Sequence, residues 1–277
     1  MAFSKKNLIT VSLTKVSLTL FFLLALSCQK MNYSPNAVFR SDTPQDINQK
    51  NIEKLLANPS HGDTIRIAII GDSQNHYDNS SDLVDVLNQV PNIDFMLHTG
   101  DLVDFGMLEE FHWMHDIFSR LYMPYITVIG NHDLLNNGEQ IFKRMYGPLD
   151  FTFIYRGIKF VYHNTNSREY NFDGTVPNLD FLRREMQPEE GVDYIIPVCH
   201  VPPFDEDFDT NLEEEYSKIM RESENLLFPI HGHLHGGGIR EFYQDDIIYV
   251  NTFAPAMRKY KIAEIVNGNW TIKEYDF

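Results

Sequence analysis

Five apolar segments of this chain each run directly into residues that can bind a metal ion. The segments end in GDSQN at 71–75, GDLVD at 100–104, NHD at 131–133, CH at 199–200 and HGHLH at 231–235. Runs rich in Ile, Val and Phe are typical of buried strands. A single Gly-Asp after a strand usually marks only a turn, but five strand ends that each finish in a potential ligand are hard to explain as turns. Because ligands of an open α/β sheet bind beyond the carboxyl ends of its strands, we expect these polar residues to meet at one edge.

The order of apolar and amphipathic segments predicts an α/β domain. Three strand-like runs alternate with two helix-like segments, which favours parallel pairing through right-handed crossovers. These elements cover residues 64–70, 80–90, 93–99, 107–121 and 125–129. Ser80 and Ser81 are placed to cap the first of the two helices. Further strands are expected at 151–155, 158–164, 193–200 and 226–232, and further helices at 179–186 and 212–222. The remainder, from about 239 to 275, predicts consecutive antiparallel strands in a second sheet.

The N-terminal segment has the pattern of a targeting sequence, so it is set apart from the fold. Three lysines precede an apolar run that ends at Cys28, and this run is too short to span a bilayer comfortably. The context LALSC resembles the lipobox of bacterial lipoproteins, with Ala25 where leucine is usual. The resemblance implies a signal peptide over 1–27 and a lipid on Cys28. A cleaved secretory peptide is the alternative.

These features predict three parts: the signal peptide, a flexible tether over 28–62 that is rich in Asn, Gln, Ser and Pro, and one domain over 63–277. The chain carries a formal net charge of −16. An acidic surface repels nucleic-acid backbones, so no long polyanion is expected as a partner. A lipid on Cys28 would anchor the protein to a membrane of the bacterial cell envelope, facing the periplasm or the exterior. The oligomeric state is not predicted.

The types of donor at the strand ends select the metal. Carboxylates, an amide and imidazoles without thiolates suit Mn, Fe or Zn and not a structural cysteine site. The five endings offer more ligands than one tetrahedral ion needs. We therefore expect two divalent ions that share a bridging carboxylate, at the short separation used in phosphoryl chemistry.

The motifs, in this order, resemble those of the calcineurin-like metallophosphoesterase family. The family signature reads GD-x-H, GD-x-x, GNH-[DE], H and GH-x-H, and this chain has GDSQ, GDLV, GNHD, CH and GHLH between about residues 65 and 236. The resemblance implies a four-layer α/β/β/α sandwich, with two mixed sheets flanked by helices and a dinuclear metal centre at the strand C-terminal ends. It implies that the first ion is held by Asp72, Gln74, Asp101 and His235. The second is then held by Asp101, Asn131, His200 and His233.

The resemblance also implies an activity and two catalytic residues. His132 matches the histidine that protonates the leaving alkoxide or stabilises the phosphoryl group, and Asp104 matches an acid that orients this histidine in some members. The implied reaction is hydrolysis of small phosphate mono- or diesters by a hydroxide that the two ions activate, with Mn favoured. His231 has no family role and is expected either to support the metal ligands from behind or to be structural. Segments 164–174, 202–211 and 254–261 are the expected rims of the site.

Gln74 departs from the signature, which has histidine at this position. A carboxamide oxygen is a weaker donor to Zn or Fe than imidazole, so the first site should prefer Mn or Mg. Two alternatives to an enzyme stay open. One is a catalytically weak or inactive module that binds phosphate or a partner. The other is a structural or adhesion protein of the outer surface, which leaves the strand-end ligands unexplained.

Overall fold

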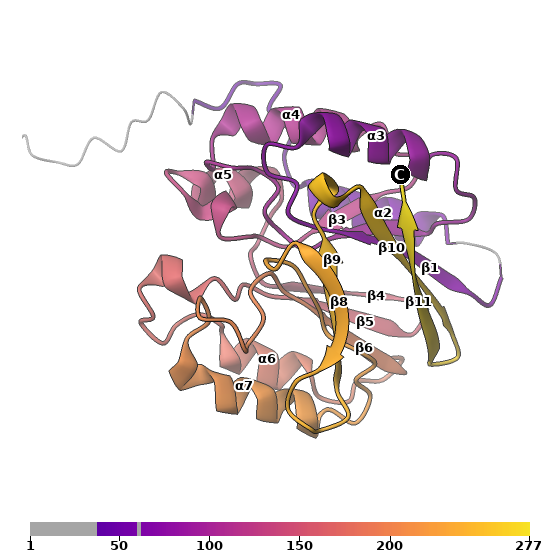
Figure 1. Cartoon of the computed structure of the whole chain (residues 1–277), viewed down its shortest axis with the longest axis vertical. Helices are drawn as coiled ribbons and strands as arrows, with labels where there is room; N and C mark the ends of the chain where they lie inside the picture. The colour runs from indigo at the N-terminus through magenta and orange to yellow at the C-terminus, as the bar shows by residue number, and fades with distance from the viewer. Residues whose placement is uncertain (1–37, 60–61) are drawn as a thin grey trace, which may run out of the picture. The chain divides into compact units, whose positions relative to one another are not determined.

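The computed structural model describes residues 38–59 and 62–277, so the predicted signal peptide and Cys28 lie outside the described residues. The domain contains two mixed sheets with helices on their outer faces (Figure 1). The first sheet has the order β11-β10-β1-β2-β3. Its strands are β1 (Ile65–Ile70), β2 (Phe95–His98), β3 (Tyr125–Thr127), β10 (Lys259–Val266) and β11 (Asn269–Asp276). As the sequence predicts, β1, β2 and β3 are parallel.

The second sheet has the order β4-β5-β6-β7-β9-β8. Its strands are β4 (Phe151–Tyr155), β5 (Ile158–Tyr162), β6 (Tyr194–Val198), β7 (Ile230–His231), β8 (Gly236–Glu241) and β9 (Ile248–Phe253). The helices are α2 (Ile47–Ala57), α3 (Tyr77–Leu87), α4 (Leu108–Phe118), α5 (Gly138–Met145), α6 (Leu179–Glu185) and α7 (Thr210–Glu222). The four-layer α/β/β/α prediction is thus confirmed.

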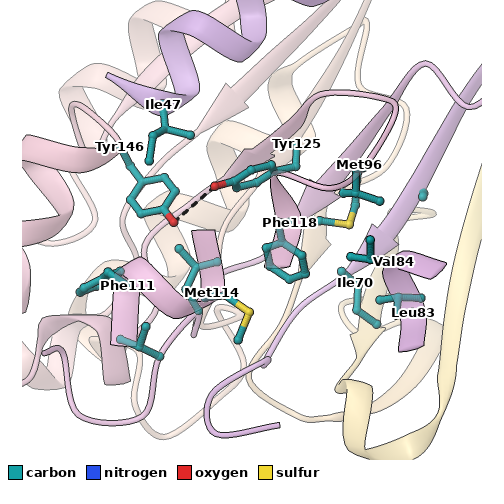
Figure 2. Close-up of a cluster of buried hydrophobic side chains, with 14 of the residues drawn as sticks. Ile47, Ile70, Leu83, Val84, Met96, Phe111, Met114, Phe118, Tyr125 and Tyr146 are labelled. Atoms are coloured by element: carbon teal, nitrogen blue, oxygen red, sulfur yellow. Dashed lines mark hydrogen bonds between the residues drawn. The ribbon is translucent and has the colours of Figure 1, made fainter. Parts of the chain in front are cut away.

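Three apolar clusters hold the layers together. One lies between the two sheets and contains Ile67, Phe95, Phe160 and Val198, among others. A second joins the first sheet to α3, α4 and α5, and Figure 2 shows part of it, including the Tyr125 and Tyr146 hydroxyls 3.5 Å apart. The third joins the second sheet to α6 and α7. Central strands such as β1, β2 and β6 are therefore buried on both faces, which is why they appear as continuous apolar runs in the sequence.

Helix α2 corrects the predicted tether, which is wrong for residues 47–57. Ile47, Ile52 and Leu55 are buried, and two asparagines of the helix complete the edge strand β3. Asn48 donates to the carbonyl of Thr127 at 2.9 Å and accepts from its N–H at 3.0 Å. The Asn content that suggests a tether instead supplies the hydrogen bonds that cover an open sheet edge.

Two further predictions need correction. Helix α3 begins at Tyr77, so Ser80 and Ser81 lie inside it and do not cap its start. The C-terminal strands do not form one antiparallel sheet. The β8–β9 hairpin belongs to the second sheet, where β9 pairs parallel with β7, and the β10–β11 hairpin pairs with β1 in the first sheet. Over 38–59 and 62–277, no helix is both long and apolar enough to cross a membrane.

Candidate metal centre

Loops at the carboxyl ends of both sheets bring the predicted ligands together. In the first sheet, Asp72 follows β1, Asp101 follows β2 and Asn131 follows β3. In the second sheet, His200 follows β6, and His233 and His235 follow β7. Donor atoms of Asp72, Asp101 and His200 all lie within 4.8 Å of one another, and these three residues are buried. Residues separated by more than 100 positions in the chain thus form one cluster.

The four residues expected to hold the second ion have converging donor atoms. Asn131 Oδ1 lies 2.9 Å from His200 Nε2 and 3.2 Å from His233 Nδ1. The two imidazole nitrogens are 3.4 Å apart, and His200 Nε2 is also 3.4 Å from Asp101 Oδ1. Ligands about 2.1 Å from one tetrahedral ion lie roughly 3.4 Å from each other. These spacings therefore suit a divalent ion with little rearrangement.

His200 is held in the tautomer that a metal needs. Its Nδ1 donates to the backbone carbonyl of Thr99 at 2.7 Å, so the lone pair of a neutral ring lies on Nε2. Burial lowers the pKa of an imidazole, but the Asp101 carboxylate, with Asp72, raises the pKa of His200 to about 10. A proton on this ring neutralises the same carboxylates that a metal ion would, so metal binding has to displace it.

The residues expected at the first ion are arranged more loosely. Asp72 is fully buried, and its Oδ1 lies 3.6 Å from His235 Nε2. Within the described part of the chain, its Oδ2 has no hydrogen-bond partner. Burial raises the pKa of this carboxyl. The Gln74 amide nitrogen donates to Asp101 Oδ2 at 3.0 Å. An orphaned, buried carboxylate oxygen is costly without a cation or a hydrogen bond, which fits a metal ligand at Asp72.

The backbone at these positions is unusual. Five of the seven predicted ligands have a positive φ: Asp72 (54°), Gln74 (40°), Asp101 (55°), His233 (71°) and His235 (56°). Each such residue costs on the order of 1–2 kcal/mol, and strain of this kind gathers at functional sites. Gly130 provides a second constraint, because a Cβ at this position would contact the backbone nitrogen and Oδ1 of Asp101. Glycine is thus required where the loops after β2 and β3 meet.

His132 lies beside this cluster and is accessible, with 35% of its side chain exposed. Its Nδ1 donates to the carbonyl oxygen of Asp104 at 2.9 Å and lies 3.4 Å from Oδ1 of the same residue. Its backbone N–H donates to Asp101 Oδ1 at 2.9 Å. Burial opposes a charged ring, but Asp101 and Asp104 raise the pKa of His132 overall. The geometry matches the predicted pairing of His132 with Asp104, whereas their catalytic roles stay predictions.

Two acids that the sequence analysis placed only on a rim also lie at the centre. Asp205 and Asp207 each have a carboxylate oxygen 3.4 Å from His233 Nε2, and the three residues form a second candidate group for a cation. The sequence signal for these two acids was the acidic stretch DEDFD that follows His200.

A third unassigned acid, Asp133, accepts from the N–H groups of Gly130 and Val103 and so fixes the loops after β3 and β2. Burial and Asp101 raise the pKa of Asp133 to about 7.

His231 is separate from this cluster, as the sequence analysis expects. It is buried, its Nδ1 donates to the Gly232 carbonyl at 3.0 Å, and its Nε2 has no partner among the described residues. The histidines and acids of the donor cluster, without His231, provide oxygen and nitrogen donors and no thiolate. Such a set of donors fits hard or borderline divalent cations. Cations held there could in turn bind the oxygens of a phosphate ester.

Comparison with solved structures supports the fold. A dimetal phosphatase from Danio rerio has a TM-score of 0.59 at 11% identity, over 76% of this chain and 96% of that one. The structure titled "GAP50 the anchor in the inner membrane complex of Plasmodium" has a TM-score of 0.58 at 14% identity, over 78% of this chain and 85% of that one. No curated protein matches the sequence.

The family assignment comes from the sequence. The profile described as calcineurin-like phosphoesterase matches residues 65–237, which is more than half of the chain and contains every predicted metal ligand. The two stacked sheets and the donor cluster at their carboxyl ends agree with this match. The chain belongs to the calcineurin-like phosphoesterase family.

Proposed function

We propose that this protein is a metal-dependent hydrolase of small phosphate mono- or diesters. The observation that supports this most directly is the convergence of Asp101, Asn131, His200 and His233, whose donor atoms make successive contacts of 2.9–3.4 Å. The side chains come from both sheets, so the fold itself assembles the cluster. A structural or adhesion role gives no reason for such an arrangement.

The chain would hold two divalent ions, one at these four residues and one at Asp72, His235 and Asp101, with Gln74 beside them. Such ions lower the pKa of bound water and neutralise charge on the phosphate oxygens. The metals remain Mn, Fe or Zn, and we favour Mn. The oxygen-rich first site is the reason for this preference.

His132 is the proposed general acid. Its Nδ1 is engaged by Asp104, which leaves Nε2 as the ring nitrogen that can meet a substrate. From Nε2, a proton can pass to the departing alkoxide oxygen as the ester bond breaks. Asp104 is the proposed positioning residue, because its carbonyl and carboxylate fix the orientation of the ring.

Asp101→Asn tests the metal-dependent activity. The wild-type domain, treated with chelator and then given Mn, should regain hydrolysis of a panel of monoesters, diesters and pyrophosphates. Asp101→Asn should lower metal affinity at least about 100-fold, a loss seen even for residues that only support metal ligands. Asp180→Asn is a matched control on the exposed side of α6. If the metal-loaded wild-type protein is inactive on every ester class, the proposed phosphoesterase activity is excluded.

A binding module is the second candidate function, and Gln74 is the observation that favours it. The amide presents its N–H to Asp101 where the family signature has a metal-binding histidine. One structure with this fold is titled an anchor, and the other a dimetal phosphatase, so the fold alone does not decide between the classes. Metal-dependent binding of phosphate without turnover would support the module.

We also propose that the domain is tethered to a membrane of the bacterial envelope by a lipid on Cys28. The support is the lipobox-like sequence LALSC. The full-length protein should enter the detergent phase on phase partitioning, and Cys28→Ser should remove this property. Partitioning that is unchanged in Cys28→Ser would show that a different segment anchors the chain.

A further inference from the structure

A cavity of about 340 Å³ opens on the second sheet next to the metal centre. Its lining residues include His231, Leu234, Gly238, Tyr249 and Asn251. Leu234 stands in the chain between the two predicted metal ligands of the GHLH motif. The cavity and the metal centre therefore share one loop.

Three buried polar atoms on residues that line this cavity have no hydrogen-bond partner among the residues that the structure describes. They are His231 Nε2, the Tyr249 hydroxyl and Asn251 Oδ1, on side chains that are 1%, 1% and 7% exposed. Native proteins rarely leave a buried polar atom unpaired, and three around one cavity indicate a site for a polar ligand.

The strand register explains how the cavity arises. His231 of β7 lies opposite Asn251 of β9, and Asn251 lies opposite Gly238 of β8, so the three positions form one row across the sheet. Paired residues point to the same face. The missing side chain at Gly238 leaves this row hollow, since a Cβ there would meet only Arg240 Nε, at 3.8 Å. Arg240 in turn lies opposite Tyr249 and also lines the cavity.

The chemistry of the unpaired atoms selects the ligand. The Nδ1 of His231 donates to a backbone carbonyl, so Nε2 is an acceptor in the neutral ring, and Asn251 Oδ1 is also an acceptor. Tyr249 adds a hydroxyl that can donate or accept. A complementary ligand needs two or more O–H or N–H donors, and no negative charge, at the end that meets these three side chains. The volume suits a group of the size of a sugar or a nucleobase.

We infer that this cavity binds the organic part of the substrate, a neutral group with several O–H or N–H donors, while the phosphate lies at the metal centre. The inference rests on the proposed phosphoesterase function and narrows its substrates. A sugar and a nucleobase carry the same donor chemistry, and the test separates them.

Gly238→Leu would fill the cavity without touching a metal ligand. Rates would be measured with phenyl phosphate, which has no donors in its organic part, with glucose 6-phosphate and with adenosine 5′-monophosphate. The wild type should prefer at least one of the last two over phenyl phosphate. Gly238→Leu should reduce that preference at least tenfold through KM, and Tyr249→Phe should reduce it about fivefold for one lost hydrogen bond. Ile239→Leu, at the next position of β8, is the control and should change nothing.

Direct binding separates this inference from the proposed activity. Calorimetric titration of the wild-type protein with adenosine and with methyl glucoside needs no turnover. Binding of one of them that is lost in Gly238→Leu supports the cavity even if no ester is hydrolysed. If the protein hydrolyses esters but both variants keep wild-type substrate preference, or if neither compound binds, the inference is overturned. The compound that binds identifies the source of the donors.

Discussion

The Gln74 amide nitrogen lies 3.0 Å from Oδ2 of Asp101, the carboxylate predicted to bridge the two ions. A glutamine that donates to the bridging carboxylate competes with the metal for the same lone pair. The first site should therefore hold its ion less tightly than the site built from Asn131, His200 and His233.

Gln74→His should restore the family pattern and strengthen the first site. Imidazole is the better donor to Zn and Fe, so tolerance of these ions should rise as well. Titration of the metal-free protein with Mn and Zn would compare the wild type, Gln74→His and Gln74→Ala. Equal affinities in the three proteins would show that Gln74 takes no part in metal binding.

His132→Asn should lower kcat by roughly 10²–10⁴-fold, the contribution of a positioned general acid. Its metal content should not change, because the ring donates to Asp104 and not to the ligand cluster. The loss should shrink with p-nitrophenyl phosphate, whose leaving group needs no proton. Asp104→Asn should give a smaller loss in the same direction. A His132→Asn protein without metal would contradict the assignment.

Gly130→Ala should destabilise the domain by roughly 2–4 kcal/mol, in the range of steric insertions at buried positions. The added methyl group would press on the Asp101 backbone, whose Cα would be only 2.8 Å away. Mn affinity should fall with stability, since the same contact positions Asp101. Gly236→Ala is the matched control, because its Cβ would have the Leu234 carbonyl oxygen as its nearest neighbour, at 3.6 Å. Denaturant unfolding of both variants would measure the difference, and equal stabilities would refute the steric argument.

His163 should make the domain sensitive to acid. Burial lowers the pKa of His163 to about 4, and its Nε2 lies 2.9 Å from the Tyr216 hydroxyl. An unfolded histidine titrates near 6.5. Above pH 6.5 both states are neutral, and between 6.5 and 4 only the unfolded state gains the proton. The free energy of unfolding should therefore fall through this window, by at most about 3 kcal/mol from this residue.

His163→Gln removes the titration and keeps a hydrogen-bonding group next to Tyr216. Its free energy of unfolding should decline less steeply than that of the wild type between pH 6.5 and 4, measured on metal-free protein. Parallel pH curves for the two proteins would contradict the assignment of acid sensitivity to this ring.

The sequence predicted that these strand-end residues would lie together, because their placement depends on local signals that repeat. Each apolar run marks a strand buried on both faces, and the residue after each run lies at the same edge of the sheet. The family resemblance implied which of these residues belong to the first metal site and which to the second. It did not identify Asp205 and Asp207, because their approach to His233 depends on how the loop after β6 folds back.

Features set by distant pairing were not predictable in this way. Asn48 and Asn51 look like tether residues until β3 is known to be an edge strand that needs partners. The C-terminal hairpins have the alternation of antiparallel strands, but nothing local assigns β8–β9 to one sheet and β10–β11 to the other. The cavity beside Asn251 likewise exists only because Gly238 lies opposite it.

The division of the last two hairpins between the sheets affects how this chain can fold. Ile65 of β1 lies opposite Ile265 of β10, two hundred positions later, and β7 gains its neighbour β9 only after residue 248. Neither sheet can be completed while residues 248–276 are still in the ribosome. Contacts of such long sequence separation also slow folding. Until these residues have emerged, the nascent domain therefore remains incomplete, with strand edges that a chaperone can bind.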